Sequence, residues 1–369
     1  MILKKNIQSD IRLFADDTYL FDISRNIEES IVNLNQDLIS LENWAEQWRV
    51  SFNPSKTVYM YFTRNQNIPH HSPLLFQQTP LQCVENHKHL GVILDKTLKW
   101  EKHISYVIEK VSYRLNCMRR LQNTVPRKCL ETVYKCMIRP VIDYGDVLFP
   151  VLTSNQAQRL ESLQRQAALI CTKAYQRTPH IFLLNELGWE SLETRRKYHC
   201  LVIMYKIQNK LSPTYLSKLC PVKRMLNAYG LRNVNDLTQI YCRYSSFRKS
   251  FFPETVASWN KLDINVREVA TLTGFKRNLK ADLLCTTNKL YSYCDGRAAI
   301  NHTRLRLGLS GLNGHRSLYN FITFSSCPKC DYELEDVEHY LLFCPRYTAH
   351  RETLLNTLDT TYGNNFHRK

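Results

Sequence analysis

Two adjacent aspartates near the start of the chain, Asp16 and Asp17, lie between two short runs of strand-forming residues. These runs, within residues 11–21, are rich in Ile, Leu, Thr and Phe, which are residue types that favour β-strands. The pattern predicts a strand, a turn and a second strand, with the acidic pair at the centre. The beginning of the chain is therefore expected to form an antiparallel β-hairpin.

The acidic pair has two interpretations. Two carboxylates at one turn repel each other, and a divalent metal ion would relieve that repulsion. Phosphoryl-transfer polymerases use a pair of Mg²⁺ ions to activate a 3′ hydroxyl and to hold the leaving pyrophosphate. The alternative is a solvated turn, because aspartate is favoured in turns for ordinary conformational reasons. The pair taken alone leaves both interpretations open.

The rest of the first hundred residues mixes helical and extended patterns. Apolar residues from Ile27 to Trp48 recur every three or four positions, which predicts an amphipathic helix. Residues 58–62 and 90–94 are predicted as strands. A loop rich in Asn, His, Pro and Gln is expected at about 65–80.

From Trp100 onward the pattern becomes mainly helical. Apolar residues again step by three and four, and further helices are expected at about 127–139, 154–173 and 190–208, with prolines between them. The apolar positions of the first of these helices are Ile104, Ile108, Val111, Leu115 and Met118. The segment 215–290 is expected to be less regular, and a final compact unit is expected to begin near Asn301.

Charge and cysteine usage limit the function classes. Lysine and arginine total 50 against 33 acidic residues, a net charge of +17, which favours nucleic acid as a partner over a generic basic protein. Most of the thirteen cysteines are scattered, as expected for free thiols in a reducing compartment. No apolar run reaches the length of a membrane helix. We expect a soluble intracellular protein without a membrane partner, in the nucleus or the cytoplasm.

The last three cysteines have the spacing of metal ligands. Cys327 and Cys330 form a Cys-x2-Cys motif, and His339 and Cys344 follow with four residues between them. Three thiolates and one imidazole are the composition of a structural zinc site, and the last two ligands are spaced for one helix. His350 is a second-choice ligand. The alternative is a coincidence of four residues.

Several motifs, in order, resemble reverse transcriptases of non-LTR retrotransposons of the jockey or CR1 type. Phe14-Ala15-Asp16-Asp17 resembles their active-site signature, and His89-Leu90-Gly91-Val92-Ile93-Leu94-Asp95 resembles the strand that grips the primer end. Other matching segments are Leu41-Glu42-Asn43-Trp44, Phe52-Asn53-Pro54-Ser55-Lys56-Thr57, Arg139-Pro140-Val141-Ile142-Asp143-Tyr144-Gly145 and Leu187-Gly188-Trp189. The resemblance extends from about residue 9 to residue 354, and its end resembles the family's C-terminal Cys-Cys-His-Cys module.

The resemblance implies an α+β fold with four parts. Residues 1–98 would form a partial polymerase palm, made of an antiparallel β-hairpin and a helix, and residues 99–214 a helical thumb. Residues 215–298 would form a connector, and residues 299–369 a small zinc-binding module. The chain would then be a fragment of an RNA-directed DNA polymerase.

The same resemblance implies roles for individual residues. Asp16 would bind Mg²⁺ directly, with Asp17 as its supporting neighbour. Lys56 would lie near the incoming triphosphate, where a cation offsets developing charge, although an ordinary loop lysine is the alternative. The expected partners are RNA and DNA, namely a template–primer duplex and the RNA of the element. Candidate phosphate contacts on the helices are Lys110, Arg114, Arg119, Arg120, Arg127, Lys128, Lys135 and Arg139, with an ordinary solvated helix face as the alternative. Arg316 and Lys329, near the last cysteines, are further candidates, with packing around a small zinc core as the alternative.

The resemblance also implies parts that these residues do not supply. Palm polymerases need a further carboxylate from a separate strand. Asp10, the one other acid before Asp16, would lie about 20 Å away on an extended strand. We therefore expect no DNA synthesis by this polypeptide alone. A nucleic-acid-binding remnant without chemistry and a degenerate gene product are the alternatives, and the oligomeric state stays open.

Overall fold

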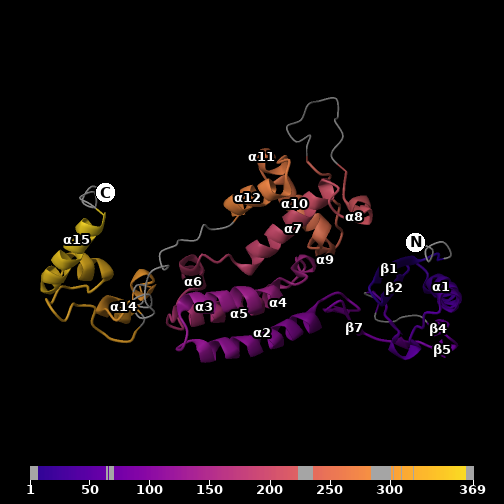
Figure 1. Cartoon of the computed structure of the whole chain (residues 1–369), viewed down its shortest axis with the longest axis horizontal. Coiled ribbons are helices and arrows are strands. Elements are labelled where there is room, and N and C mark those ends of the chain that lie inside the picture. The colour runs from indigo at the N-terminus through magenta and orange to yellow at the C-terminus, as the bar shows by residue number, and fades with distance from the viewer. Residues whose placement is uncertain are drawn as a thin grey trace. The chain divides into compact units, whose positions relative to one another are not determined.

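The computed structural model describes residues 7–63, 65, 70–222, 236–283, 301, 303–308, 310–318 and 320–362. The chain divides into two compact units, residues 1–103 and residues 104–369 (Figure 1). Helices and small sheets are both present, in agreement with the expected mixed class. None of the described helices has the length and hydrophobicity that a membrane-spanning segment needs.

The first unit begins with the predicted hairpin. Strands β1 (Asp10–Phe14) and β2 (Asp17–Phe21) pair antiparallel, and their register leaves Ala15 and Asp16 as a two-residue turn. Ala15 has a φ of 51°, a left-handed conformation of the kind that closes such tight turns. The acidic pair therefore lies at one tip of the hairpin, as predicted.

A long helix packs against this hairpin. Helix α1 (Ile27–Trp48) begins at Asn26, whose side chain accepts the backbone N–H of Glu28 and so caps the helix. Its apolar face forms the core of the unit together with one residue of β1, one loop residue and one residue of the later strand β4 (Leu75–Phe76). The buried members of this core are Ile11, Ile31, Leu38, Leu41, Leu74 and Phe76. Trp48, expected on the same face, is instead 50% exposed because it lies in the last turn, beyond the core.

The later strands of this unit are shorter than predicted. Strand β3 (Val58–Tyr59) covers only the start of the expected strand 58–62, and it pairs in parallel with β6 (Gln82–Cys83). A two-residue hairpin, β4 (Leu75–Phe76) with β5 (Thr79–Pro80), lies inside the segment that was expected to be a loop.

The predicted strand 90–94 is wrong at its start. Strands β7 (Asn86–His89) and β8 (Val92–Asp95) form an antiparallel hairpin, and Leu90 and Gly91 are its turn. Both turn residues have positive φ, 45° and 83°, which is the conformation that two-residue hairpins require. The apolar Leu90 concealed this turn in the sequence.

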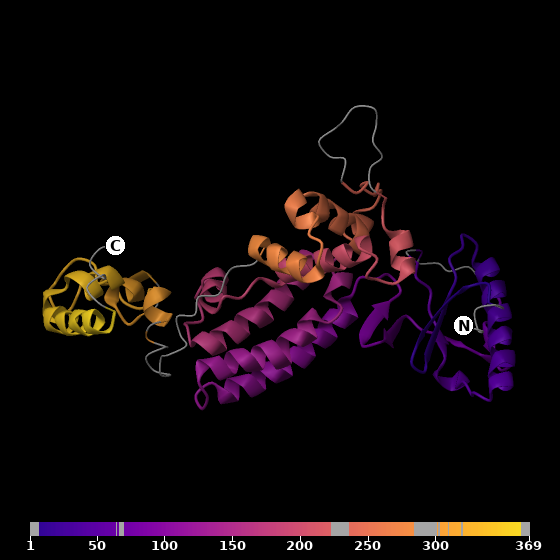
Figure 2. The same cartoon turned by 45° about the horizontal axis from the view of Figure 1, so that its top comes forward.

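The second unit is helical. Helix α2 (Glu101–Leu121) runs beside α5 (Ser154–Thr172) in both views (Figures 1 and 2). Four of its five predicted core positions are buried, and Ile108 is half-buried, with Val107 buried beside it. Helix α6 (His180–Leu187) was not predicted, whereas α7 (Leu192–Gln208) was.

The helix predicted at 127–139 is interrupted. It consists of α3 (Arg127–Val133), a π-helical turn (Tyr134–Ile138) and α4 (Arg139–Asp143), followed by a 3₁₀ turn (Asp146–Leu148). Pro140 has no backbone N–H to donate, which explains why the regular hydrogen-bond pattern changes just before it.

The segment expected to be less regular contains several short helices, separated by irregular residues such as 236–244. It contains helices α8, α9, α10, α11 and α12, which span Thr214–Leu219, Ser245–Arg248, Phe251–Asn260, Ile264–Arg267 and Leu272–Leu283. Helices α10 and α12 pack on α7, where Tyr205 stacks on Phe275 with ring centroids 4.3 Å apart. These helices are short, so their periodicity was weak in the sequence.

The end of the chain forms a small module around the last cysteines. Its described elements are α14 (Asn313–Leu318), a π-helical turn (His339–Phe343), a 3₁₀ turn (Pro345–Tyr347) and α15 (Thr348–Tyr362). We call the described residues from 301 to 362 the Cys/His module.

Candidate functional site

The two aspartates of the first hairpin are both exposed at its tip. Asp10 lies at the opposite end of the same hairpin and forms an ion pair with Arg12 at 3.2 Å. Among the described residues, Asp16 and Asp17 do not join any group of three potential metal ligands. The geometry thus provides two adjacent carboxylates that face solvent and leaves Asp10 far from them, as predicted.

The second hairpin lies against the strand that follows the aspartates. The imidazole of His89, in β7, packs on the ring of Tyr19, in β2, with ring centroids 4.7 Å apart. Burial raises the pKa of the Tyr19 hydroxyl. This contact ties the hairpin that resembles a primer grip to the hairpin that carries Asp16 and Asp17.

Lys56 is exposed at the end of a 3₁₀ turn, Pro54–Lys56, which begins at Asn53. The side chain of Asn53 accepts the backbone N–H of Ser55 and so holds the turn. In the described part of the chain, no hydrogen bond or ion pair joins Lys56 to Asp16 or Asp17. A role for Lys56 near a triphosphate stays a prediction.

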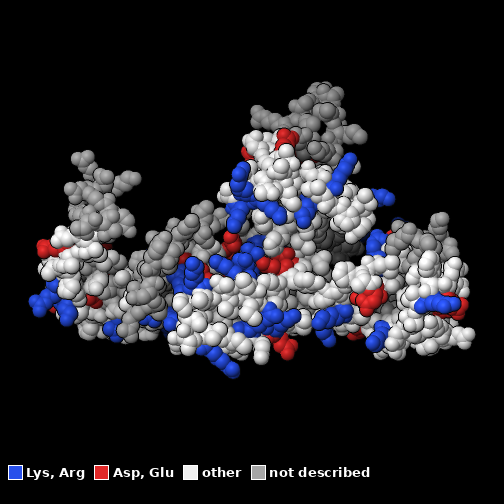
Figure 3. Space-filling view, viewed as in Figure 1, with Lys and Arg blue, Asp and Glu red and all other residues white. Residues whose placement is uncertain are grey.

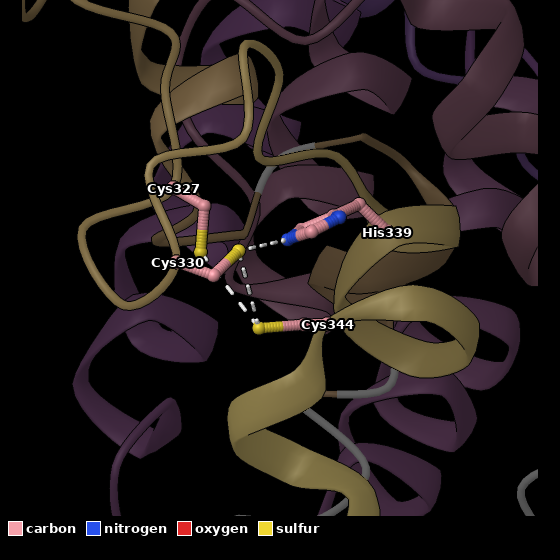
Figure 4. Close-up of side chains that lie close together, drawn as sticks. All are labelled: Cys327, Cys330, His339 and Cys344. Carbon is pink, nitrogen blue, oxygen red and sulfur yellow. Dashed lines mark hydrogen bonds between the residues drawn. The ribbon is translucent and has the colours of Figure 1, made fainter.

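The four residues with metal-ligand spacing converge at one point (Figure 4). Cys330 Sγ lies 3.2 Å from His339 Nε2 and 3.8 Å from Cys344 Sγ, and Cys327 Sγ lies 3.9 Å from Cys344 Sγ. All four donor atoms are within 4.8 Å of one another, and Cys327, His339 and Cys344 are buried. The predicted cluster forms, and His350 is not part of it.

Local hydrogen bonds explain how the chain brings these ligands together. The Cys327 carbonyl accepts the N–H of Asp331 at 2.9 Å, and the Cys327 N–H donates to the Tyr332 carbonyl at 2.8 Å, which closes the knuckle. Downstream, the N–H of Cys344 donates to the carbonyl of His339 at 2.7 Å. This bond over five residues widens the helix into a π turn, so that the two ligands face the same way.

The cluster is suited to a cation. Burial raises the pKa of the Cys327 thiol to about 11. Burial would also raise the pKa of Cys344, but the backbone N–H of Arg346 and the neighbouring thiols lower it instead. The buried carboxylate of Glu335 lies 3.8 Å from Cys327 Sγ. Several groups that become anionic are thus buried together, an arrangement that a bound metal ion would stabilise.

The donor set also fits zinc in its details. Three sulfur atoms and one imidazole nitrogen make the closed set of a structural zinc site. The His339 ring is stacked on Tyr332, with centroids 4.6 Å apart and planes 2° from parallel, which holds its orientation. Its Nε2, 3.2 Å from Cys330 Sγ, is the nitrogen that faces the sulfur atoms.

A second Asp/His group, which the sequence analysis missed, lies in the helical unit. His199 Nδ1 is 2.6 Å from the buried carboxylate of Asp146, and Asp143 lies nearby. However, Arg195 already binds Asp143 at 2.5 Å, with Arg139 at 3.9 Å. Guanidinium groups therefore neutralise this group, and we interpret it as an ion-pair network. Residues so far apart in sequence gave no spacing signal.

Lys and Arg side chains are spread over the face of the molecule drawn in Figure 3. The candidate phosphate contacts differ in their surroundings. Lys110, Arg119 and Arg120 are exposed on α2, and Arg316 and Lys329 are exposed in the Cys/His module. Arg114 is half-buried and donates to the backbone carbonyl of Met137. Arg127 is only 11% exposed and is paired with Glu131 and Glu186, so the expectation of a phosphate contact there is wrong.

The curated proteins that this sequence matches are RNA-directed DNA polymerases of mobile elements. No protein-family model matches the sequence, and no solved structure matches it. The "Probable RNA-directed DNA polymerase from transposon BS" of Drosophila melanogaster is 27% identical over 157 residues, which are 42% of this chain and 17% of that protein. The "Probable RNA-directed DNA polymerase from transposon X-element" of the same species is 23% identical over 168 residues, 45% of this chain and 18% of that protein.

A third relative matches a longer part. The "RNA-directed DNA polymerase from mobile element jockey" of Drosophila funebris is 26% identical over 198 residues, 51% of this chain and 21% of that protein. The matched residues thus span about a fifth of the length of these relatives. Over about half of its length, this chain is homologous to the RNA-directed DNA polymerases of the BS, X-element and jockey non-LTR retrotransposons.

Proposed function

We propose that this chain contributes part of the catalytic centre, the duplex-binding helices and a zinc-binding module to an RNA-directed DNA polymerase. The observation that carries the proposal is the Asp16–Asp17 pair at the tip of the β1–β2 hairpin, in a chain homologous to such polymerases. Asp16 would be the direct ligand of Mg²⁺, and Asp17 would be its supporting neighbour. The bound ion would activate the 3′ hydroxyl and stabilise the leaving pyrophosphate.

The chain's own residues supply the surroundings of this chemistry. The two exposed carboxylates repel each other across a tight turn, which favours binding of a cation between them. Lys56 would offset the negative charge of the triphosphate. The β7–β8 hairpin, tied to β2 through His89 and Tyr19, would support the primer end beside the aspartates.

The basic helical unit would hold a template–primer duplex of RNA and DNA through its phosphates. Lys110, Arg119 and Arg120 are exposed on α2, and the chain has a net charge of +17. Phosphate contacts of this kind bind the backbone without reading the base sequence. In the Cys/His module, Arg316 and Lys329 would add contacts of the same type, beside a zinc ion held by Cys327, Cys330, His339 and Cys344.

A second candidate function is nucleic-acid binding without catalysis. Asp16 and Asp17 have no third carboxylate, cysteine or histidine at ligand distance among the described residues. A polypeptide of these 369 residues, taken by itself, is therefore expected to bind nucleic acid but not to incorporate nucleotides.

Primer extension tests both functions. With a homopolymer template and Mg²⁺ or Mn²⁺, we expect no incorporation by this polypeptide above the level of its Asp16→Ala variant. The decisive protein is a chimera in which residues 7–369 of this chain replace the part of the jockey polymerase that begins at its own aspartate hairpin. We expect the chimera to extend a primer, and Asp16→Ala to abolish extension.

The control substitution is Asp10→Asn, which removes an acid from the far end of the same hairpin and should leave extension by the chimera unchanged. A chimera that binds the duplex but fails to extend it would favour the binding function over the polymerase function. Incorporation by the polypeptide alone that depends on Asp16 would contradict the expectation of inactivity.

A further inference from the structure

A carboxylate of the helical part of the second unit is buried between cationic groups. Glu186, near the end of α6, has a side chain that is 3% exposed. Arg127, at the start of α3, donates to the Glu186 carboxylate at 3.0 Å and to its backbone carbonyl at 3.0 Å. Burial would lower the pKa of Arg127, but the hydrogen bond to Glu186 and the charge of Glu131 raise it instead. Arg127 is therefore held as a cation inside the protein.

A residue of the Cys/His module completes this pair. The hydroxyl oxygen of Thr303, which is 1% exposed, accepts a hydrogen bond from Arg127 at 2.8 Å. The same hydroxyl donates to the Glu186 carboxylate at 3.4 Å, and Arg306 Nε lies 3.9 Å from the other carboxylate oxygen. The Thr303 hydroxyl thus connects Glu186, which lies 117 positions earlier in the sequence, with Arg127, which lies 176 positions earlier.

Two further contacts lie beside this one. Arg304 donates to the backbone carbonyl of Lys173, at the end of α5, at 3.3 Å. Its guanidinium also lies 5.4 Å from the ring centroid of Tyr175, and Phe321 lies 5.9 Å from the same ring. A polar, a cation–π and an aromatic contact therefore join the module to the ends of α3, α5 and α6.

The contacting residues belong to the same packed module as the cysteine cluster. His315 Nδ1 lies 2.8 Å from the hydroxyl of Ser310, close after the contacting segment. The N–H of Asn313 donates to the Glu335 carboxylate at 2.7 Å, and Glu335 in turn lies 3.8 Å from Cys327 Sγ. Gly308, two residues after Arg306, lies against the His315 ring. The segment that contacts Glu186 is thus connected through His315, Asn313 and Glu335 to the cysteine cluster.

We propose that the surface formed by Arg127, Glu186 and Tyr175 is a docking site for residues 303–306, which fixes the Cys/His module on the helical unit. The two parts then act as one nucleic-acid-binding body. The chemistry of the site accounts for its occupant. A buried acid and base that are already paired accept a small hydroxyl that can donate and accept at once, as Thr303 does. The docking does not depend on catalytic activity.

Cleavage of the full chain tests the docking. A recognition sequence for a site-specific protease is placed within residues 284–300, and the purified protein is cleaved. We expect the piece that contains the module to co-elute with the remainder in size-exclusion chromatography. Glu186→Gln and Thr303→Val should each weaken the association of the two pieces by about tenfold or more, because each leaves a buried polar partner unsatisfied.

The matched control is Glu190→Gln, since Glu190 also pairs with a largely covered arginine, Arg195 at 3.5 Å, without a described contact to the module. This variant should keep the association unchanged. Thr303→Val alters the module side alone, so that a loss of association there cannot come from unfolding of α6. Circular dichroism and the metal content of the freed piece verify that both pieces stay folded.

Three outcomes would overturn the proposal. The pieces of the unsubstituted protein would separate after cleavage, or Thr303→Val and Glu186→Gln would associate as tightly as the unsubstituted protein. Alternatively, Glu190→Gln would release the module as readily as Glu186→Gln. Association would then depend on the stability of the helical unit and not on the contact made by Glu186.

Discussion

The carboxylate of Asp37, in the middle of α1, accepts the backbone N–H of Ser9 at 2.8 Å, one residue before the hairpin begins. Its other oxygen accepts the N–H of Gln8, also at 2.8 Å, and the Asp37 residue is only 1% exposed. A single buried carboxylate thus joins the helix to the strand that leads to Asp16. The position of the acidic tip depends on this contact as well as on the apolar core.

Replacement of Asp37 should loosen the hairpin. Asp37→Ala leaves the buried N–H of Ser9 and the partly buried N–H of Gln8 without an acceptor, so the free energy of unfolding of the first unit should fall by about 2 kcal/mol. Asp37→Asn keeps one acceptor and should cost less. Denaturant unfolding of the first unit measures the change, with Asp10→Asn as an exposed control within about 0.5 kcal/mol of the unsubstituted protein. Equal stability of Asp37→Ala and Asp10→Asn would contradict the role of this carboxylate.

Metal removal should unfold the Cys/His module. The four ligands are buried together with Glu335, so loss of a bound zinc ion leaves their charges without a counterion. We expect about one zinc ion per chain in the purified protein and loss of module structure by circular dichroism after chelation. Cys327→Ser should lose the metal, whereas Cys129→Ser, at an exposed free thiol, should keep it. Zinc content unaffected by Cys327→Ser would disprove the site.

Stability should depend on pH through Glu161, in α5. Burial raises the pKa of Glu161 above its ordinary value of 4.5, against a hydrogen bond from the N–H of Leu192, and one carboxylate oxygen is buried without a hydrogen-bond partner. The folded state therefore binds the proton more tightly than the unfolded state. The contribution of Glu161 to the free energy of unfolding is therefore fully present below pH 4.5, and it is lost as the pH rises through the raised pKa of the folded state.

A substitution makes this dependence measurable. Glu161→Gln cannot ionise, so it should unfold with a free energy about 1 kcal/mol higher than the unsubstituted protein at neutral pH. The difference should vanish at acidic pH, where Glu161 is protonated. Glu109→Gln, at an exposed acid of α2 that does not act on Glu161, should show neither effect. Destabilisation by Glu161→Gln at neutral pH would mean that the charged form is the favoured one.

Nucleic-acid affinity should depend on the exposed face of α2. Replacing Lys110, Arg119 and Arg120 with alanine should weaken duplex binding, and the slope of log affinity against log salt should become shallower by about 0.9 for each phosphate that is no longer neutralised. The same removal of charge on α12, at Lys276, Arg277 and Lys280, serves as the control and should change the slope less. If the salt dependence of affinity had the same slope for the α2 and the α12 triple variants, binding would depend on the net charge and not on the exposed face of α2.

Much of the secondary structure followed from local pattern. The apolar period of three and four residues located α1, α2, α5 and α7, because a helix buries one face against the core. The Cys-x2-Cys spacing located the cysteine cluster for a similar reason, since ligands that share a knuckle lie close along the chain. Where local pattern was ambiguous the prediction failed, as at Leu90, whose apolar side chain concealed a turn.

The amino-acid sequence by itself determined the acidic hairpin, the main helices and the cluster of three cysteines and one histidine, because each is set by residues close together in the chain. Tertiary structure alone decided that Arg127 pairs with Glu186 and Thr303 instead of facing solvent, and that Asp37 holds the start of β1. These contacts join residues far apart in the chain. Burial makes each polar group depend on a hydrogen-bonding partner, and no local pattern of residues encodes which partner the fold brings close.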